Sequence, residues 1–540
     1  MTRPVTDRMS TWAATHPDQL AVVAADRKRG KFRGFTYGAF EQRTRELAAG
    51  FVDLGFAGQR VVLMVTPGKG MFESGYGLMR AGAVPILIDP GLGLASVTQG
   101  LNETAPTGFV GIPTALAART LYRWAPNATV VSSSRINKGT LSLDDVADRG
   151  RALLRGGTAI VPSLIAEDEP AAIVFTSGST GPPKGVVMTH KIFGAQVDMI
   201  TAMYGLEGGM RSLSTFAPFA LLGPLMGLTT YLPRMDFSKP GDVDPTRIIE
   251  MTDAFKPDLL FGSPALLDRV GRYGEATGDK LDGVELVLSA GAPVRRHVQR
   301  RILDMVPDGT VIATPYGATE ALPVATIDSA ELATIDEPGI CIGRPVDGID
   351  VTIIPVIDEP VPDVNAVAKV PVGSYGEIVV KGPNVSLEYV DRPLDQAMAK
   401  LAWDGEVAHR MGDLGRFDEE GRLWFGGRRS HRVRAADQDI PAVPVEAVVD
   451  QHPAVARAAL VGVGAPGEQT LIVCVELEDG HDDTVLDEIL EFVIGHPDAA
   501  AVHADRVVQI LSHKGFPTDV RHNSKIDRPA LAVWATKRLG

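Results

Sequence analysis

An apolar run leads directly into a loop of glycines and hydroxyl residues, and this junction most constrains the fold. Residues 171–175 are typical of a strand, and residues 176–185 read Thr-Ser-Gly-Ser-Thr-Gly-Pro-Pro-Lys-Gly. Glycines let the backbone approach an anion, successive N–H groups form an anion site, and the hydroxyls and Lys184 add donors and charge. We therefore predict a nucleoside triphosphate here, the alternative being an ordinary surface loop. A Walker A loop is excluded, because Lys184 follows two prolines and precedes no Ser or Thr.

The bulk composition describes an acidic globular chain of more than one domain. A length of 540 residues exceeds the size at which one hydrophobic core stops growing. A net charge of −14 offers no basic surface for nucleic acid or an anionic membrane. Cys341 and Cys474 suit a reducing compartment, and the uncharged stretch 212–233 is broken by prolines and glycines. We expect a soluble, cytoplasmic protein with no transmembrane segment and no nucleic-acid partner.

Strand-like and helix-like segments alternate through most of the chain. The pattern predicts strands at 61–65, 83–88, 258–261, 284–288 and 311–314, and helices at 40–54, 75–81 and 294–305. This alternation predicts an α/β fold in which helices cover parallel-type sheets and the chemistry lies at the carboxyl ends of strands.

The pattern changes twice towards the C-terminus. Short strands and glycine-rich turns predict a β-rich subdomain at 351–427, within a large N-terminal domain of residues 1–427. The polar, basic stretch 428–434 is expected to be a hinge. Residues 435–540, with two strand-like runs and an amphipathic helix near 485–494, are expected to form a small α+β domain.

A second polar motif follows the strand predicted at 311–314. It reads Tyr316-Gly317-Ala318-Thr319-Glu320. A tyrosine offers a face on which adenine stacks, a threonine hydroxyl bonds a phosphate, and a glutamate holds Mg²⁺, which takes oxygen ligands and bridges phosphates. The alternative is a turn with a core tyrosine.

Both motifs resemble those of the acyl-adenylating, or AMP-binding, superfamily of acyl-CoA synthetases, luciferases and peptide-synthetase adenylation domains. The resemblance extends over nearly the whole chain and includes segment 289–293, the run from Arg410 to Asp413, and Lys525 near the C-terminus. It implies the adenylating-enzyme fold with a mobile C-terminal domain, and ATP and Mg²⁺ as cofactors. It also implies a first half-reaction in which a carboxylate attacks ATP, pyrophosphate leaves and an acyl-AMP remains.

The resemblance also implies a role for individual residues. Charge at the phosphates would be neutralised by Lys184, Lys525 and Mg²⁺, and Mg²⁺ would be held by Glu320 and Thr176. The nucleotide would be bound by Thr176, Ser177, Gly178, Ser179, Thr180, Gly181, Gly291, Ala292, Tyr316, Gly317, Thr319, Asp413 and Arg428. Within this set Asp413 and Arg428 would contact the ribose.

Two departures from the ligases bear on the second half-reaction. Ala220 stands where many acyl-CoA synthetases have the histidine of an aromatic-His motif. Past the hinge, Asp437 stands where ligases have the glycine of a Lys-x-x-Gly loop. That loop helps to build the thioester-forming conformation and needs the backbone freedom of glycine. Transfer to CoA or to a carrier thiol is therefore not expected.

These departures fit the β-lactone synthetases of bacterial long-chain olefin biosynthesis, which the chain resembles most. The shared strings lie at 219–221, 314–324, 409–413, 421–425 and 531–535. The resemblance implies a 2-alkyl-3-hydroxy fatty acid whose 3-hydroxyl attacks the activated carbonyl, so that a β-lactone closes and AMP leaves. Because the nucleophile is already attached, effective molarity offsets part of the ring strain. The resemblance also implies a thiolase-like condensing enzyme and a short-chain reductase as pathway partners.

The general base for the 3-hydroxyl and the function of the protein both have alternatives. His190, just after the phosphate loop, and His409 are candidates for the base, and either could instead be a structural histidine. The rival enzymes are a long-chain acyl-CoA synthetase and a fatty acyl-AMP ligase. A rival of another class is a catalytically silent scaffold, against which the co-occurrence of Lys184, Glu320 and Lys525 argues.

Overall fold

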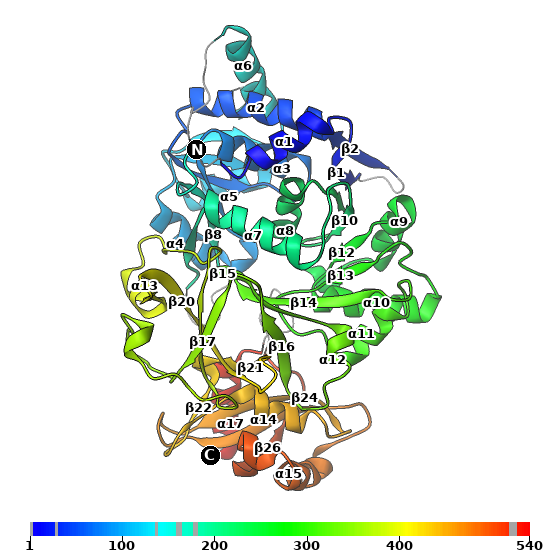
Figure 1. Cartoon of the computed structure of the whole chain (residues 1–540), viewed down its shortest axis with the longest axis vertical. Coiled ribbons are helices and arrows are strands. Elements are labelled where there is room, and N and C mark those ends of the chain that lie inside the picture. The colour runs from blue at the N-terminus through cyan, green and yellow to red at the C-terminus, as the bar shows by residue number, and fades with distance from the viewer. Residues whose placement is uncertain (1–3, 27–30, 136–138, 158–164, 177–181, 518–525) are drawn as a thin grey trace. The chain divides into compact units, whose positions relative to one another are not determined.

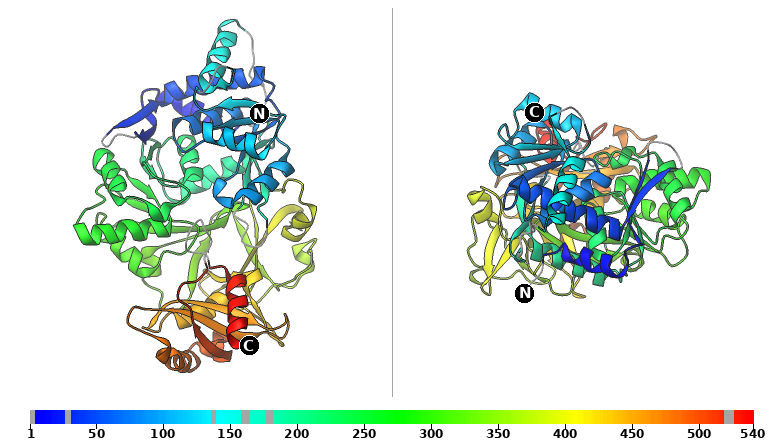
Figure 2. Two further views of the ribbon diagram at one scale, coloured as in Figure 1. Left: turned by 180° about the vertical axis from the view of Figure 1, so that it is seen from behind. Right: turned by 90° about the horizontal axis from the view of Figure 1, so that it is seen from above.

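The computed structural model describes residues 4–26, 31–135, 139–157, 165–176, 182–517 and 526–540. The chain divides into two compact units. Unit 1 comprises Met1–Ala313, Gly317–Pro323 and Pro383–Gln396, and unit 2 comprises Thr314–Tyr316, Val324–Gly382 and Ala397–Gly540. Figure 1 labels the elements of both units, and Figure 2 shows them from two further sides in the same colours.

A seven-stranded sheet in unit 1 contains the strand that enters the phosphate loop. Its order is β7-β6-β5-β3-β4-β8-β9, with parallel pairing except between β8 and β9. The strands are β3 (Arg60–Met64), β4 (Val84–Leu87), β5 (Gly108–Gly111), β6 (Thr129–Ser132), β7 (Leu141–Ser142), β8 (Pro170–Phe175) and β9 (Gly185–Thr189). The associated helices are α2 (Tyr37–Asp53), α3 (Lys69–Arg80), α4 (Leu94–Thr104), α5 (Pro113–Tyr122), α6 (Leu143–Arg155) and α7 (His190–Met203).

Both faces of this sheet are buried, which explains its continuous apolar strands. Val61 and Leu63 of β3 pack with α2, α3 and α6, whereas Val62 and Met64 pack with α4 on the opposite face. Successive residues of a strand point to opposite faces, so a sheet covered by helices on both sides needs apolar residues at every position.

A second set of strands in unit 1 has the order β2-β1-β11-β10-β12-β13-β14. The strands are β1 (Leu20–Ala25), β2 (Phe32–Thr36), β10 (Arg211–Ser214), β11 (Thr229–Leu232), β12 (Leu259–Phe261), β13 (Leu286–Leu288) and β14 (Val311–Ala318). The helices are α1 (Asp7–Thr15), α8 (Ala217–Leu222), α9 (Pro245–Phe255), α10 (Pro264–Thr277) and α11 (Arg296–Leu303). Leu259 and Phe261 of β12 face α1, α7 and α8, and Leu260 faces α9, α10 and α11.

Unit 2 begins with antiparallel strands. Their order is β17-β18-β20-β21-β16, and β19 pairs with β20. The elements are α12 (Ser329–Leu332), β16 (Ile340–Pro345), β17 (Asp350–Ile354), β18 (Gly376–Lys381), β19 (Lys400–Trp403), β20 (Glu406–Phe417) and β21 (Leu423–Arg428). Three elements contain a boundary between the units: β14, β15 (Ala321–Asp328) and α13 (Pro393–Ala399).

The C-terminal part of unit 2 is an α+β arrangement. Strands β24 (Val455–Val463), β25 (Thr470–Leu477) and β26 (Val507–Ser512) form one sheet, and β22 (Val433–Arg434) pairs with β23 (Asp439–Ile440). One face of the three-stranded sheet packs with α14 (Ala442–Val449) and α15 (Leu486–Gly495), and the other with α17 (Arg528–Leu539). The short helix α16 spans Ala499–Val502.

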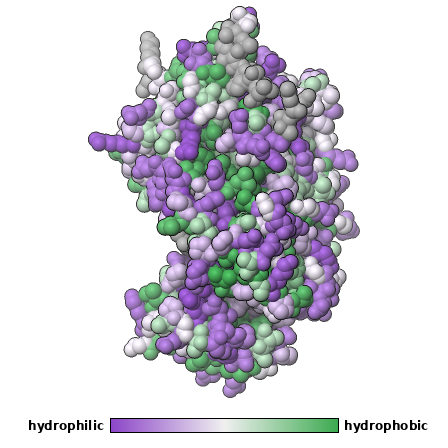
Figure 3. Space-filling model, turned by 60° about the vertical axis from the view of Figure 1, so that its left-hand side comes forward, coloured by the Kyte–Doolittle hydropathy of each residue, from purple (hydrophilic) through white to green (hydrophobic). Residues whose placement is uncertain are grey.

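The surface is mainly polar. Most side chains on the face drawn in Figure 3 are hydrophilic, with smaller groups of hydrophobic side chains between them. Within the described ranges, every helix is too short or too polar to cross a membrane. Cys341 and Cys474 are buried free thiols, and burial raises the pKa of Cys474 to about 12.

The predicted α/β class is confirmed, and the differences concern boundaries. The helix expected at 75–81 begins six residues earlier, at Lys69. The glycines of this helix lower its predicted helix propensity. Gly77 is nevertheless needed for packing, because a Cβ added there would lie only 2.9 Å from the Cβ of Leu47 in α2. The predicted boundary at 427/428 stays a prediction. The hinge at 428–434 stays a prediction.

The α2–α6 contact generates a stability prediction. A Cβ added at Gly150 in α6 would lie 1.8 Å from the backbone oxygen of Glu46 in α2. Gly150→Ala must push the helices apart, so we expect it to lower the free energy of unfolding by about 1–3 kcal/mol. The measurement is a thermal or urea melt. Gly75→Ala is the control, since its added Cβ meets Leu63 at an ordinary 3.6 Å. Equal melting of the two variants would contradict the prediction.

Candidate active site

The two ends of the 176–185 loop, predicted to bind phosphates, are joined at the edge of the seven-stranded sheet. The backbone N–H of Thr176 donates to the carbonyl oxygen of Lys184 at 3.0 Å, and the N–H of Lys184 donates to Thr176 Oγ1 at 3.3 Å. These bonds continue the antiparallel β8–β9 ladder beyond Phe175 and Gly185. Ser177, Gly178, Ser179, Thr180 and Gly181 lie outside the described residues. Thr176 and Lys184 are therefore fixed as the loop's two ends.

The Lys184 side chain lies between an acid and an aromatic ring. Its Nζ is 2.9 Å from Asp395 Oδ1 and 5.3 Å from the centre of the Tyr389 ring. The segment before α13 runs beside β9, since Val187 N–H donates to Glu388 O at 3.1 Å and Val390 N–H donates to Gly185 O at 2.9 Å. This pairing places the Tyr389 ring beside the lysine.

Tyr389 also binds Glu320. Its hydroxyl donates to Glu320 Oε1 at 2.8 Å, and the backbone oxygen of Glu320 accepts from the N–H of Ser386 at 2.7 Å. Burial, followed by the negative charge of Glu320, raises the pKa of Tyr389 far above its usual value. The tyrosine thus stays protonated as a donor, and one side chain contacts both Lys184 and Glu320.

The remaining predicted residues of unit 1 lie at or just after the carboxyl ends of β13 and β14. Gly291 has φ of +93°, a conformation that favours glycine, and Ala292 follows it in the same loop. A Cβ added at Gly317 would lie 2.7 Å from the carbonyl oxygen of Ala321, so this position needs glycine. Thr319 lies in the half-buried turn between β14 and β15.

A second cluster lies within unit 2. The Tyr316 hydroxyl donates to Asp413 Oδ2 at 2.7 Å, and Arg428 Nη1 lies 2.8 Å from Asp413 Oδ1. Asp413 and Arg428 are opposite each other in the β20–β21 ladder. Asp413 is only 3% exposed, and a buried carboxylate needs such partners. Two carboxylate oxygens offer about four acceptor sites, so Asp413 can accept further hydroxyl donors.

A buried ion pair supports the strand that carries Asp413. Arg410 Nε donates to Glu377 Oε2 at 3.0 Å, and both side chains are 1% exposed. Arg410 Nη1 also donates to the backbone oxygen of Glu359 at 2.9 Å, and Arg429 Nη1 donates to that of Ile357 at 3.0 Å. The guanidinium of Arg410 thus ties β18, β20 and the 357–359 loop together. Burial raises the pKa of Glu377, against the opposing pull of Arg410.

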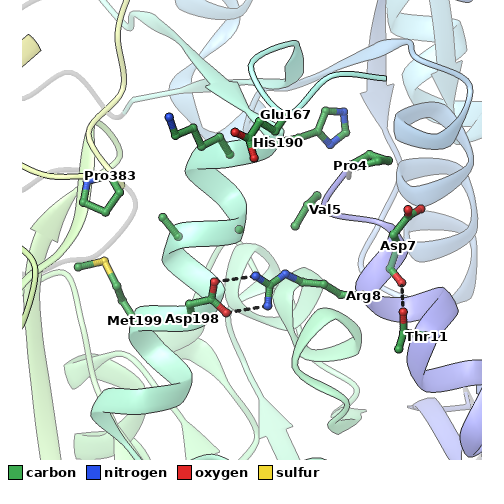
Figure 4. A pocket seen from close by; sticks show the side chains of 13 residues that line it. Pro4, Val5, Asp7, Arg8, Thr11, Glu167, His190, Asp198, Met199 and Pro383 are labelled. Carbon is green, nitrogen blue, oxygen red and sulfur yellow. Dashed lines mark hydrogen bonds and ion pairs between the residues drawn. The ribbon is translucent and has the colours of Figure 1, made fainter. Parts of the chain in front are cut away.

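His190 lines a pocket in unit 1. The pocket has a volume of about 550 Å³ and is bordered by α1, α7, Glu167 and Pro383 (Figure 4). His190 is 2% exposed, and its Nδ1 has no hydrogen-bond partner among the described residues. Burial lowers the pKa of His190 to about 4. Nearby, Arg8 and Asp198 form a two-bond ion pair at 2.7 and 2.6 Å.

His409 lies in β20, with Nδ1 3.2 Å from the carbonyl oxygen of Ala399. A carbonyl accepts only a donor, so Nδ1 carries the proton and Nε2 is the basic nitrogen. Lys525 lies outside the described residues. Among the residues that are described, no group of three His, Cys, Asp or Glu side chains is placed to hold a metal.

Four of these side chains were not found from the sequence: Tyr389, Asp395, Arg410 and Glu377. Arg410 is a buried cation in β20 and therefore needs an acid partner, but the strand also contains His409 and Asp413, so its sequence is not apolar enough to mark Arg410 as buried. Tyr389 and Asp395 lie about two hundred positions after Lys184, and no local pattern pairs them with the loop.

The α/β architecture of unit 1 and the C-terminal α+β part of unit 2 are those of an adenylate-forming enzyme fold. Residues 9–390 match the AMP-binding enzyme family, to which the chain belongs. Among solved structures, ATP-bound MatB from Rhodopseudomonas palustris superposes with a TM-score of 0.76 at 17% identity, covering 100% of both chains.

Two curated relatives are similar over nearly their whole length. The olefin beta-lactone synthetase of Xanthomonas campestris pv. campestris is 39% identical, over 97% of this chain and 96% of its own. The olefin beta-lactone synthetase of Stenotrophomonas maltophilia is 40% identical, over 100% of this chain and 99% of its own.

The unit 2 cluster predicts how nucleotide binding depends on Asp413. Asp413→Asn removes the charge that faces Arg428 and weakens acceptance of hydroxyls, so we expect ATP affinity to fall by about tenfold or more. Calorimetric titration with ATP measures this. Tyr316→Phe keeps the ring and removes one bond to Asp413, and we expect a smaller loss. An Asp413→Asn protein that melts normally and binds ATP as wild type does would exclude the ribose role.

Proposed function

We propose that this protein is an ATP-dependent β-lactone synthetase acting on a long-chain 2-alkyl-3-hydroxy fatty acid. Adenylation of the carboxylate would be followed by attack of the substrate's own 3-hydroxyl, with release of AMP. The observation that carries the proposal is the 39–40% identity, over nearly full length, to two olefin beta-lactone synthetases.

The described residues fit a Mg²⁺–nucleotide complex. Mg²⁺ in nucleotide sites is usually held by one or two carboxylates together with substrate phosphates, so a single oriented glutamate is sufficient. The Tyr389 hydroxyl orients Glu320, and Thr176 supplies a hydroxyl at the loop's end. When bound there, Mg²⁺ would neutralise negative charge on the phosphates.

Positive side chains would act in the adenylation step. We assign Lys184 to the departing phosphates and Lys525 to the α-phosphate that the carboxylate attacks. Each would supply a positive charge where negative charge develops, which is the general means by which phosphoryl-type transfers are accelerated. Asp413 would accept the ribose hydroxyls and thereby hold the reacting phosphorus in place.

The second step needs no thiol. The 3-hydroxyl oxygen bonds to the activated carbonyl carbon, the bond from that carbon to the AMP oxygen breaks, and the hydroxyl proton passes to a base. Ala220, at the ligase histidine position, is fully buried in an apolar cluster, and the neighbouring Phe219 ring stacks on Phe261 with centres 4.5 Å apart. Asp437, at the ligase glycine position, is paired with Arg506 at 2.7 Å.

The cellular setting is part of the same proposal. We propose a cytoplasmic location, with which two buried free thiols agree. A condensing enzyme of the thiolase type and a short-chain reductase would supply the hydroxy acid.

The decisive experiment omits CoA. Purified protein is incubated with ATP, Mg²⁺ and a synthetic 2-alkyl-3-hydroxy acid, and the organic product is identified by NMR without heating. We expect a β-lactone and one AMP per lactone. Lys525→Ala should lower pyrophosphate release at least about a hundredfold, while Lys514→Ala, at an exposed position nearby, should leave it unchanged. Acyl-AMP that accumulates until CoA or a carrier thiol is added would contradict the lactone proposal and indicate a ligase.

A separate prediction concerns His190 as the base. With a pKa of about 4, His190 is deprotonated throughout the neutral range, so its acid limb in a pH–rate profile should lie near pH 4 and not near 6.5. His190→Gln should reduce lactone formation while pyrophosphate release continues. His481→Gln, at an exposed position, is the control. Unchanged lactone yield from His190→Gln would leave His409 as the candidate.

A further inference from the structure

Lys184 is already paired with an anion that belongs to the protein. Its Nζ lies 2.9 Å from Asp395 Oδ1, and the two side chains are 23% and 32% exposed. An ammonium ion has three donors, but two neighbouring anions repel each other. A phosphate that binds Lys184 must therefore compete with Asp395 for the same charge.

Asp395 has a second cation within reach. Arg392 Nη1 lies 3.7 Å from Asp395 Oδ2, and Arg392 is itself tied to Glu103, with Nη2 2.8 Å from Oε1. If the Lys184 ammonium moves from Asp395 to a phosphate, Arg392 still lies beside the Asp395 carboxylate, which is therefore not left without a cation. Arg392 thus lowers the cost of separating Lys184 from Asp395, so the ion pair can break and form again.

The backbone that presents Asp395 is held firmly. The Gln396 side chain accepts from the N–H of Tyr389 at 3.0 Å and donates to the carbonyl oxygen of Leu387 at 2.9 Å. The Tyr389 ring, whose hydroxyl is bound to Glu320, forms the floor beneath Lys184 Nζ. The position of the lysine is thus set by Asp395 and Tyr389 of one segment of unit 1, while Glu320 of a second segment holds the tyrosine.

We propose that Asp395 is a positioning residue that competes with phosphate for Lys184. It holds the ammonium against the Tyr389 ring, yields it to the phosphates of the incoming nucleotide, and takes it back as pyrophosphate leaves. The inference rests on the proposed function only in requiring that a nucleotide binds the 176–185 loop. It adds to that function a group that tunes substrate entry and product release.

The experiment measures binding without the acid substrate. Asp395→Asn keeps the size of the side chain and removes its charge. Without the carboxylate, phosphate no longer competes for Lys184. Because the lost ion pair is partly exposed, we expect the affinities for pyrophosphate and ATP to become tighter by roughly threefold to fivefold. Calorimetric titration of the full-length protein with each ligand gives these values. In steady state, pyrophosphate should inhibit Asp395→Asn more strongly than wild type.

Three matched variants separate competition from a structural effect. Asp391→Asn removes one charge from the same segment at a position with φ of +48°, which asparagine tolerates, and should leave both affinities unchanged. Asp395→Glu restores the carboxylate and should return the affinities towards wild type. In a Lys184→Gln background, Asp395→Asn should have no further effect, because a coupling energy disappears when one partner is absent.

The outcomes distinguish this inference from the proposed function. A wild-type protein that binds neither ATP nor pyrophosphate would contradict both. Wild-type binding with unchanged or weaker binding by Asp395→Asn would overturn the role of Asp395 alone. An equal gain from Asp391→Asn would show a general charge effect and would likewise overturn it.

Discussion

If the 176–185 loop binds phosphates, as we propose, it must admit an anion and yet end at fixed points. In this protein the fixed points are Thr176 and Lys184, which are joined by one backbone bond and one bond to the Thr176 hydroxyl, at the edge of a sheet whose two faces are both buried. The β8–β9 pairing fixes the backbone at Lys184, and Asp395 and Tyr389 then hold its side chain. The positions of the two loop ends in unit 1 therefore depend on one short antiparallel pairing between β8 and β9.

Unit 2 meets the same requirement with buried charge. Asp413 and Arg410 stand three positions apart in β20, and each is paired, with Arg428 and with Glu377 respectively. A buried ion pair contributes little net stability, because desolvation offsets most of the attraction. Its effect is on the relative positions of the strands, since the planar guanidinium of an arginine holds its donors in a rigid arrangement that few partner positions satisfy. The Glu377–Arg410 pair thus fixes the strand from which Asp413 presents its carboxylate.

Most helices and strands could be predicted from the sequence. The features that could not be predicted share a cause, which is contact between parts of the chain that are distant in sequence. Strands such as 61–65 and helices such as α2 follow from local periodicity, which reports burial directly. The start of α3 was missed because its glycines weaken helix propensity while their lack of side chains permits close packing. Asp395 and Tyr389 were missed because their contact with Lys184 arises only when the 385–390 segment lies beside β9, and pairing over that sequence distance leaves no local pattern.

The order in which the chain visits the two units has a consequence for its synthesis. Unit 1 is not finished at Ala313, because it also takes Gly317–Pro323 and Pro383–Gln396. During translation the N-terminal sheets can form early, but Glu320 meets the Tyr389 hydroxyl only after the ribosome has passed residue 389. A nascent chain therefore exposes the strands of an incomplete unit 2 while unit 1 still lacks its last segment. A protein cut anywhere between residues 314 and 396 would separate groups that belong to one site.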